Sequence, residues 1–281
     1  MSFSKNRLEE DVRTAGLAHV QQKIYLPTNY PDIAATKLLI NGKLVDSSNG
    51  DRFETFNPTT EVIITDVPRA STNDVETAIL AAKTAYNETS WPMLLQSHRG
   101  YHLYKLAQLV EEKQKLFMHL GLIDSGKTSV NIANDIRHCI GTLHTFAHSH
   151  GQHHQKLSYV AEDGEQTATS YFRDSCGVIA AIITSHNPLT SLAQVISPAL
   201  AYGNTVVILI DEEAPLMALQ FAALLHQAGF PSGTINILTG TGKVRNTHLA
   251  IHRDINKVFL NLIPSIYFIT ICIQTNQLMD Y

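Results

Sequence analysis

The chain has 281 residues, of which 44% are hydrophobic and 16% charged, and its formal net charge at pH 7 is -4. This composition is typical of a globular protein with one large domain or two smaller ones. The pI near 6.4 leaves no basic surface for a phosphate backbone, so we expect no nucleic-acid partner.

Neither export nor a membrane span is indicated. The N-terminus contains acidic residues and lacks the apolar core of a signal peptide. The longest apolar run, residues 258–273, is shorter than the ~20 residues of a spanning helix and is interrupted by Asn261, Pro264 and Thr270. Three cysteines at scattered positions fit neither a disulfide framework nor a zinc site. We expect a cytoplasmic protein that makes no membrane contact.

The first half of the chain predicts a polar extension, then strands, then helices. Residues 1–36 form the extension, with a short helix from Arg7 to Val20, and residues 38–67 are extended. Asn41-Gly42 suits a tight hairpin turn, because both positions tolerate positive φ. Ser71 is the expected N-cap of a helix with a regular apolar stripe, and two further helices are predicted over residues 97–120 and 130–150.

The second half alternates strands and helices. Uninterrupted apolar runs at residues 177–183, 205–210 and 235–238 are typical of strands buried on both faces. Helices are predicted between them, over residues 192–202 and 214–228. This order predicts an α/β fold with a doubly wound parallel sheet.

Three segments of this half occur in the order and spacing of the aldehyde dehydrogenase superfamily. They are Gly177 through Asn187, where the family has a strand ending in a Pro-Trp-Asn-Phe-Pro turn, Pro198-Ala-Leu-Ala-Tyr-Gly-Asn-Thr-Val-Val207, and Ala228-Gly-Phe-Pro-Ser-Gly-Thr-Ile-Asn236. Ile40-Asn41-Gly42 and Asn57-Pro58 resemble N-terminal landmarks of the same family. The chain therefore resembles the cofactor-binding front part of an aldehyde dehydrogenase, and Pro198–Val207 is most similar to the second module of aldehyde dehydrogenase family 16.

The resemblance divides the chain into three parts. Residues 1–36 are an N-terminal extension, residues 37–259 an NAD(P)-binding region of the Rossmann-like, aldehyde dehydrogenase type, and residues 260–281 a divergent tail. The tail looks like the ending of a truncated or alternatively spliced product, and the catalytic domain is missing. The N-terminal strands are expected to belong to an oligomerisation unit, which implies a homo-oligomer or assembly with other aldehyde dehydrogenase-like chains.

NAD or NADP is the cofactor that the resemblance implies. Its contacts would fall on Thr184, Ser185, Glu212, Gly240 and Gly242. The family holds the adenosine ribose with a lysine and a glutamate, which here correspond to Leu209 and Glu212. Leucine cannot donate the charged hydrogen bond of the lysine, a loss of about 1.5–3 kcal/mol. A third glycine position is Asn246, so cofactor binding is weakened further.

Catalysis in the family needs a cysteine nucleophile, a glutamate base and an asparagine that helps to hold the oxyanion. Only the asparagine has a counterpart, Asn187. Cys272 lies in the divergent tail and is not preceded by the Gly-Gln that leads to the family's catalytic cysteine. It is therefore not a candidate nucleophile. The resemblance therefore implies an oxidoreductase fragment, or pseudoenzyme, that does not oxidise aldehydes by itself.

Two other functions remain open. Gly121–Thr128 fits the P-loop pattern G-x-x-x-x-G-K-[ST], although such a loop must follow a strand and the preceding residues are helical in period. A non-catalytic scaffold is the other alternative, because a truncated fold would expose apolar surface.

Six histidines fall within 17 residues, between His138 and His154, and His144 and His148 have the i, i+4 spacing of two metal ligands on a helix. No carboxylate or cysteine joins them at ligand spacing, so we interpret them as a solvated helix end and expect no metal.

Overall fold

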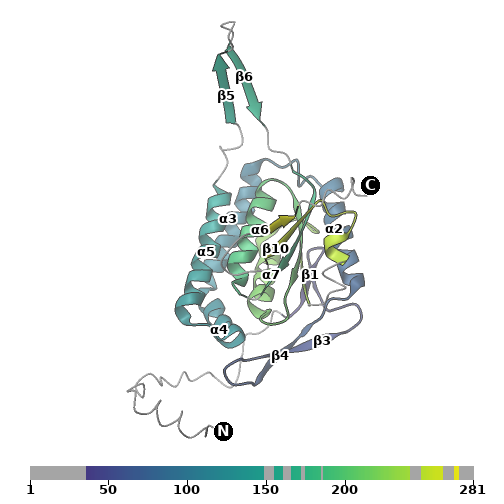
Figure 1. Ribbon diagram of the computed structural model, residues 1–281, viewed down its shortest axis with the longest axis vertical. Helices are drawn as coiled ribbons and strands as arrows, with labels where there is room; N and C mark the ends of the chain where they lie inside the picture. The colour runs from purple at the N-terminus through teal and green to yellow at the C-terminus, as the bar shows by residue number, and fades with distance from the viewer. Residues whose placement is uncertain are drawn as a thin grey trace, which may run out of the picture. The chain divides into compact units, whose positions relative to one another are not determined.

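The computed structural model describes residues 36–148, 155–160, 166–171, 175–184, 186–240, 248–261 and 269–271. Within these residues, seven strands form one sheet in the order β11-β10-β7-β8-β9-β1-β2 (Figure 1). Its four parallel strands are β7 (Val178–Ile183), β8 (Thr205–Ile210), β9 (Ile235–Thr239) and β10 (Lys257–Asn261). The predicted α/β fold with a mainly parallel sheet is confirmed, and β10 crosses the expected boundary at residue 259. The helix predicted near the N-terminus lies outside the described residues.

Helices cover both faces of the sheet, which explains the continuous apolar strands. Every residue of β8 and β9 is buried. On one face lie α6 (Pro188–Ala201) and α7 (Leu216–Ala228), covered in turn by α3 (Gln96–Glu112), α4 (Gln114–Ser125) and α5 (Ser129–Ala147) (Figure 1). The other face carries α2 (Thr72–Glu88). Among the described residues, no helix combines the length and apolar character needed to cross a membrane.

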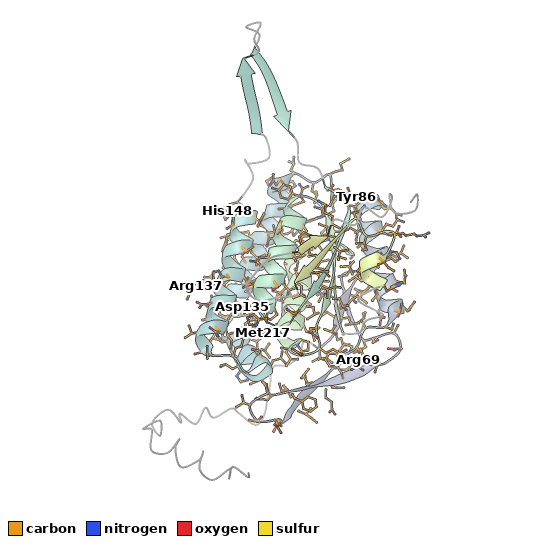
Figure 2. All side chains as sticks on the ribbon, in the orientation of Figure 1. Arg69, Tyr86, Asp135, Arg137, His148 and Met217 are labelled. Atoms are coloured by element: carbon orange, nitrogen blue, oxygen red, sulfur yellow. The ribbon has the colours of Figure 1, made fainter. Side chains whose placement is uncertain are left out.

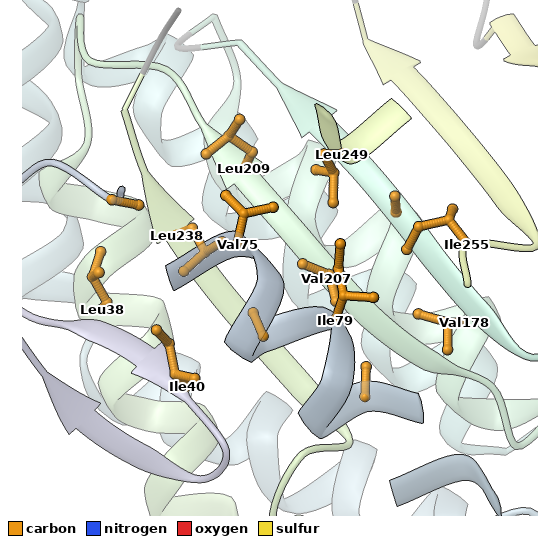
Figure 3. Close-up of a cluster of buried hydrophobic side chains, with 14 of the residues drawn as sticks. Leu38, Ile40, Val75, Ile79, Val178, Val207, Leu209, Leu238, Leu249 and Ile255 are labelled. Carbon is orange, nitrogen blue, oxygen red and sulfur yellow. The ribbon is translucent and has the colours of Figure 1, made fainter. Parts of the chain in front are cut away.

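The core between α2 and the sheet is a cluster of aliphatic side chains (Figure 3). Val75 and Ile79 come from α2, Val207 and Leu209 from β8, and Leu249 from a helical turn at residues 248–251. The predicted stripe of α2 is confirmed, and so is its N-cap, because Ser71 and Asp74 form a reciprocal capping box.

Antiparallel pairs close both edges of the sheet. The predicted hairpin at Asn41-Gly42 is confirmed, with φ of 50° and 71°, and joins β1 (Leu38–Ile40) to β2 (Lys43–Val45). β1 continues the main sheet beside β9, and β11 (Ile269–Ile271) pairs with β10 at the other edge. β3 (Arg52–Phe56) and β4 (Ile63–Pro68) form a separate two-stranded sheet.

Two expectations from the sequence were incomplete. The single helix predicted over residues 97–120 is two helices, α3 and α4, that meet at Lys113. The buried stripe of α3 ends at Val110, and the next positions that could continue it, Lys113 and Gln114, are polar and exposed. The antiparallel pair β5 (Gln155–Val160) and β6 (Gln166–Tyr171) was not predicted, because its residues are largely polar.

Candidate functional site

The carboxyl ends of the parallel strands bring together three of the predicted cofactor residues. Thr184 follows β7, Glu212 lies two residues after β8, and Gly240 follows β9. The order of strands reverses between β7 and β10, which is the position where open α/β sheets bind ligands. Ser185, Gly242 and Asn246 lie outside the described residues.

The first helix after this edge, α6, begins against a carboxylate from α5. Oδ1 of Asp135 accepts a hydrogen bond from the backbone N–H of Thr190 at 2.8 Å, and Oδ2 accepts one from Leu189 at 3.3 Å. Asp135 is buried and lies in the helical layer on the α6 side of the sheet (Figure 2). The N–H groups that could cradle a phosphate at this helix start already have a partner.

The second helix, α7, begins in the same way. The backbone N–H of Leu216, its first residue, donates to Oδ2 of Asp124 at 2.8 Å. Asp124 is 2% exposed, and among the described residues its Oδ1 has no hydrogen-bond partner. Burial raises the pKa of this carboxyl to about 7, although the hydrogen bond from Leu216 opposes the shift. Buried carboxyl groups from α4 and α5 therefore accept hydrogen bonds from the first N–H groups of both α6 and α7.

Asn187, the predicted oxyanion residue, stands at the N-cap position of α6 and is half-buried. Its side chain makes no capping hydrogen bond; instead, Nζ of Lys127 donates to its Oδ1 at 3.3 Å. Burial lowers the pKa of Lys127, partly offset by the charge of Asp135. Because an ammonium can only donate, this contact fixes the amide oxygen toward Lys127 and leaves Nδ2 as the free end of the amide to donate elsewhere.

Glu212, the predicted ribose acceptor, forms a bidentate ion pair with Arg69. Nε and Nη2 of Arg69 donate to the two carboxylate oxygens of Glu212, each at 2.9 Å. Asp51 lies 3.5 Å from the same guanidinium. The Glu212 side chain is 21% exposed, so it lies at the surface of the strand edge. Leu209, at the position of the family lysine, is 1% exposed and packs into the core.

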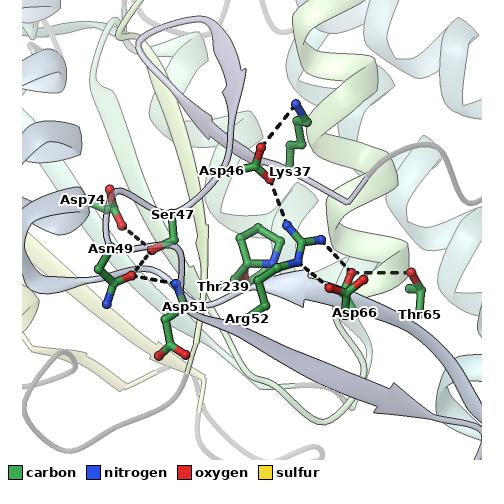
Figure 4. A network of polar contacts seen from close by, with 11 residues as sticks. Lys37, Asp46, Ser47, Asn49, Asp51, Arg52, Thr65, Asp66, Asp74 and Thr239 are labelled. Carbon is green, nitrogen blue, oxygen red and sulfur yellow. Dashed lines mark hydrogen bonds and ion pairs between the residues drawn. The ribbon is translucent and has the colours of Figure 1, made fainter.

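The segment that carries Arg69 is tied to the end of β9. The hydroxyl of Thr239 donates to the carbonyl of Pro68 at 2.6 Å, and the N–H of Ala70 donates to the carbonyl of Thr239 at 2.8 Å. Thr239 is fully buried and adjoins the ion-pair network of β3 and β4 (Figure 4). Arg69 is thus held over the ends of β8 and β9 by backbone geometry as well as by its charge.

The arrangement matches known proteins along most of the chain. Residues 44–261 fit the sequence model of the aldehyde dehydrogenase family. The chain belongs to this family. Aldehyde dehydrogenase 1A1 of Homo sapiens is 37% identical over 228 residues, which are 80% of this chain and 45% of that protein. Omega-crystallin of Enteroctopus dofleini is 34% identical over 234 residues, 83% of this chain and 46% of that protein.

Solved structures of the family agree with the fold. The NAD+ complex of an aldehyde dehydrogenase from Bacillus cereus superposes with a TM-score of 0.72 at 30% identity, and the match covers 80% of this chain and 45% of that one. The chain therefore spans less than half the length of the aldehyde dehydrogenases that it matches.

The aldehyde dehydrogenase nucleophile is a cysteine, and neither described cysteine fits that role. Cys139 is fully buried, and burial raises the pKa of its thiol well above the usual value, which disfavours the reactive thiolate. Cys176 precedes β7, whereas Asn187 follows it, so the strand separates them by about 20 Å. Cys272 lies outside the described residues.

The P-loop alternative is wrong for this fold. Residues 114–125 are the helix α4, where a P-loop needs a strand. Gly126 ends that helix in the left-handed conformation, with φ of 63°, and Thr128 caps α5 by accepting from the N–H of Asn131. The motif is a helix–helix junction, and its lysine contacts Asn187.

Two histidines at the C-terminal end of α5 contact an aromatic ring. The rings of His144 and His148 lie 5.4 and 5.9 Å from that of Tyr104, centroid to centroid. His150, His153 and His154 lie outside the described residues.

Three residues that shape the site were missed in the sequence. Asp124 and Asp135 lie on the buried stripes of their helices, next to Ile123 and Ile136. A carboxylate on an apolar stripe needs a buried hydrogen-bond partner, so its position could have predicted that it caps another helix. Arg69 carries no such signal, because its partner lies 143 residues away.

Proposed function

We propose that this chain is a weak NAD(P)-binding module of the aldehyde dehydrogenase type and does not oxidise aldehydes by itself. The observation that carries the proposal is the placement of Glu212 and Gly240 at the ends of the adjacent strands β8 and β9. A carboxylate there can accept a ribose hydroxyl, and a glycine lets a phosphate approach the backbone.

The closed helix starts support this position for the cofactor. Asp135 and Asp124 occupy N–H groups at the start of α6 and of α7, so an anion at either place would find those donors already hydrogen-bonded. Phosphates are then directed toward Gly240, at the end of β9. The Bacillus cereus relative was solved as an NAD+ complex, which supports a dinucleotide as the ligand.

Two features argue for low affinity. Leu209 supplies no charged hydrogen bond, and Arg69 competes with a ribose for the carboxylate of Glu212. The first loss is about 1.5–3 kcal/mol, or roughly ten- to a hundredfold in affinity. The choice between NAD and NADP is governed by this same end of β8, where a 2′-phosphate would meet the negative charge of Glu212. We therefore expect NAD to bind better than NADP.

Aldehyde oxidation would require groups that the described residues do not bring to Asn187. The amide of Asn187, oriented by Lys127, can donate to a developing oxyanion. Because Cys139 is buried and Cys176 lies at the opposite end of β7, no described thiol can form the covalent intermediate there.

Calorimetric titration of the purified chain tests the proposal, with NAD, NADP and ATP–Mg²⁺ as ligands. We expect weak binding of NAD, weaker binding of NADP and no binding of ATP. Glu212→Gln should weaken NAD binding about tenfold. ATP binding that depends on Lys127, or turnover of an aldehyde with NAD, would contradict the proposal.

A second candidate function is assembly with another chain of the family, and one surface favours it. A recess of about 340 Å³ lies over the amino ends of β7 and β10 and is lined largely by apolar side chains, among them Ile179, Val195 and Phe259. The partner would be a second copy or another aldehyde dehydrogenase-like chain that covers this recess. Light scattering of the chain alone and with such a partner measures the assembly, and Phe259→Glu should abolish it. If the chain is a monomer both alone and with the partner, this role is contradicted.

A further inference from the structure

Three potential metal ligands meet on the α2 side of the sheet, away from the residues discussed so far. Glu76 comes from α2, His248 begins the helical turn at residues 248–251, and His252 follows that turn. Nε2 of His248 lies 2.6 Å from Oε1 of Glu76, and Nε2 of His252 lies 3.3 Å from Oε2. One ligand atom from each residue lies within 4.8 Å of the other two.

The backbone around this cluster is fixed by the core. Val75 and Leu249, the neighbours of Glu76 and His248, are both fully buried in the cluster of Figure 3. A second tie is the ion pair between Lys83 and Asp254, with Nζ and Oδ1 2.8 Å apart. This pair also offsets the charge of Lys83, the one lysine of α2, so that charge does not oppose a cation. Because the backbone at these residues is already ordered, a ligand would lose little binding free energy to ordering it.

We propose that Glu76, His248 and His252 bind one divalent transition-metal ion of the zinc class. Two imidazole nitrogens and one carboxylate suit this class, whereas Ca²⁺ and Mg²⁺ favour sites built of oxygen atoms. Three protein ligands leave the fourth position of a tetrahedral ion to water. The i, i+4 spacing of the histidines directs both rings toward the same side, with ring centroids 5.6 Å apart.

The three ligands are not equivalent. The backbone N–H of Asp254 donates to Nδ1 of His252 at 3.2 Å, which requires the ring proton on Nε2. Coordination through Nε2 moves that proton to Nδ1, so His252 must give up this hydrogen bond when the metal binds. The site therefore has two strong ligands, Glu76 and His248, and a weaker third.

Titration of the full chain with ZnCl₂ tests the proposal, with CoCl₂ as a spectroscopic probe of ligand geometry. We expect one zinc ion with micromolar affinity, a visible Co²⁺ spectrum of tetrahedral intensity, and a higher melting temperature with zinc. His248→Ala and Glu76→Gln should each weaken binding at least about tenfold, and His252→Ala should weaken it less. The measurement needs no dinucleotide, so it is independent of the proposed function.

The chain has 14 histidines, so a matched control is needed. His148→Ala removes one member of a second i, i+4 pair, which has Tyr104 beside it where the proposed site has Glu76. This variant should bind zinc like the wild type, and all variants should show the far-ultraviolet circular dichroism of the folded chain. No zinc binding by the wild type would overturn the proposal. So would binding that is unchanged by both His248→Ala and Glu76→Gln, or binding lost in His148→Ala.

Discussion

Arg69 and Glu212 are joined by two parallel hydrogen bonds of 2.9 Å between segments 143 residues apart. A guanidinium and a carboxylate in this geometry satisfy each other, so the acceptor expected to hold a ribose is already in use. Both side chains are partly exposed, at 30% and 21%, and an ion pair of this kind contributes about 1 kcal/mol. The pair is weak enough for a ligand to displace.

Removing Arg69 should therefore strengthen cofactor binding. We expect Arg69→Ala to raise the affinity for NAD about fivefold, because the ribose no longer competes with the guanidinium. Calorimetry measures this change. Arg52→Ala is the matched control, since Arg52 pairs with Asp66 and Asp46 instead. Weaker NAD binding by Arg69→Ala would identify Arg69 as a cofactor ligand and not a competitor.

The buried carboxyl of Asp124 should make stability depend on pH. Its folded pKa of about 7 is above the ordinary 3.8, so the folded state binds a proton more tightly than the unfolded state. Its contribution to the free energy of unfolding therefore falls as pH rises from about 4 to about 7 and is constant above that range. The stability of Asp124→Asn lacks this dependence. We therefore expect its free energy of unfolding, relative to that of the wild type, to rise by a few kcal/mol between about pH 5 and about pH 8. Urea unfolding measures the difference; parallel pH profiles would contradict the assignment.

Asp74, a buried carboxylate in the first turn of α2, should contribute to stability in a pH-dependent way. It accepts hydrogen bonds from the N–H groups of Ser71 and Ser48. It also accepts one from the hydroxyl of Ser47 (Figure 4). Burial opposes its ionisation, but these hydrogen bonds outweigh burial and lower its pKa. Its stabilisation is thus present above about pH 4 and lost as pH falls below that value.

We expect Asp74→Ala to lower the free energy of unfolding by about 2–3 kcal/mol at neutral pH. Asp46→Ala is the comparison, because Asp46 is 52% exposed and its ion pairs with Lys37 and Arg52 should contribute less than about 1 kcal/mol. Equal losses in the two variants, measured by chemical denaturation, would show that the capping network adds nothing beyond surface charge.

Gly177 should not tolerate a side chain. It has φ of 116°, and a Cβ atom would collide with Oδ1 of Asn256, which accepts the N–H of Val178 at 2.8 Å. Gly177→Ala should cost about 2 kcal/mol or more. Gly141→Ala, in an open position on α5, should instead stabilise the chain by up to about 1 kcal/mol. Thermal unfolding of both variants gives the comparison, and a neutral Gly177→Ala would refute the packing argument.

The parallel sheet could be predicted from the sequence because burial on both faces leaves its mark on every residue of a strand, as in β8. The start of α2 could be predicted because Ser71 and Asp74 act within one turn. The break at Lys113 was harder to see, since the apolar period on each side of it is regular.

The sequence could predict only those residues of the candidate site whose position depends on the neighbouring strand in the chain. Glu212 and Gly240 follow β8 and β9, two strands that the sequence predicts, whereas the side chains that contact the site come from distant segments. Neither Arg69 beside Glu212 nor Lys127 beside Asn187 has a local pattern that relates it to its partner. The same holds for Glu76, which is 172 residues from His248.

The place of β1 in the sheet also sets an order of events during synthesis. Leu39 pairs with Ile237, so the hairpin of β1 and β2 has no neighbour in the main sheet until β9 has been synthesised. Contacts this remote in sequence slow folding, because a long loop must close before they stabilise anything. The apolar residues of β1 therefore lack their partner strand during the synthesis of about two hundred residues, and an unpaired apolar strand of this kind is prone to aggregate.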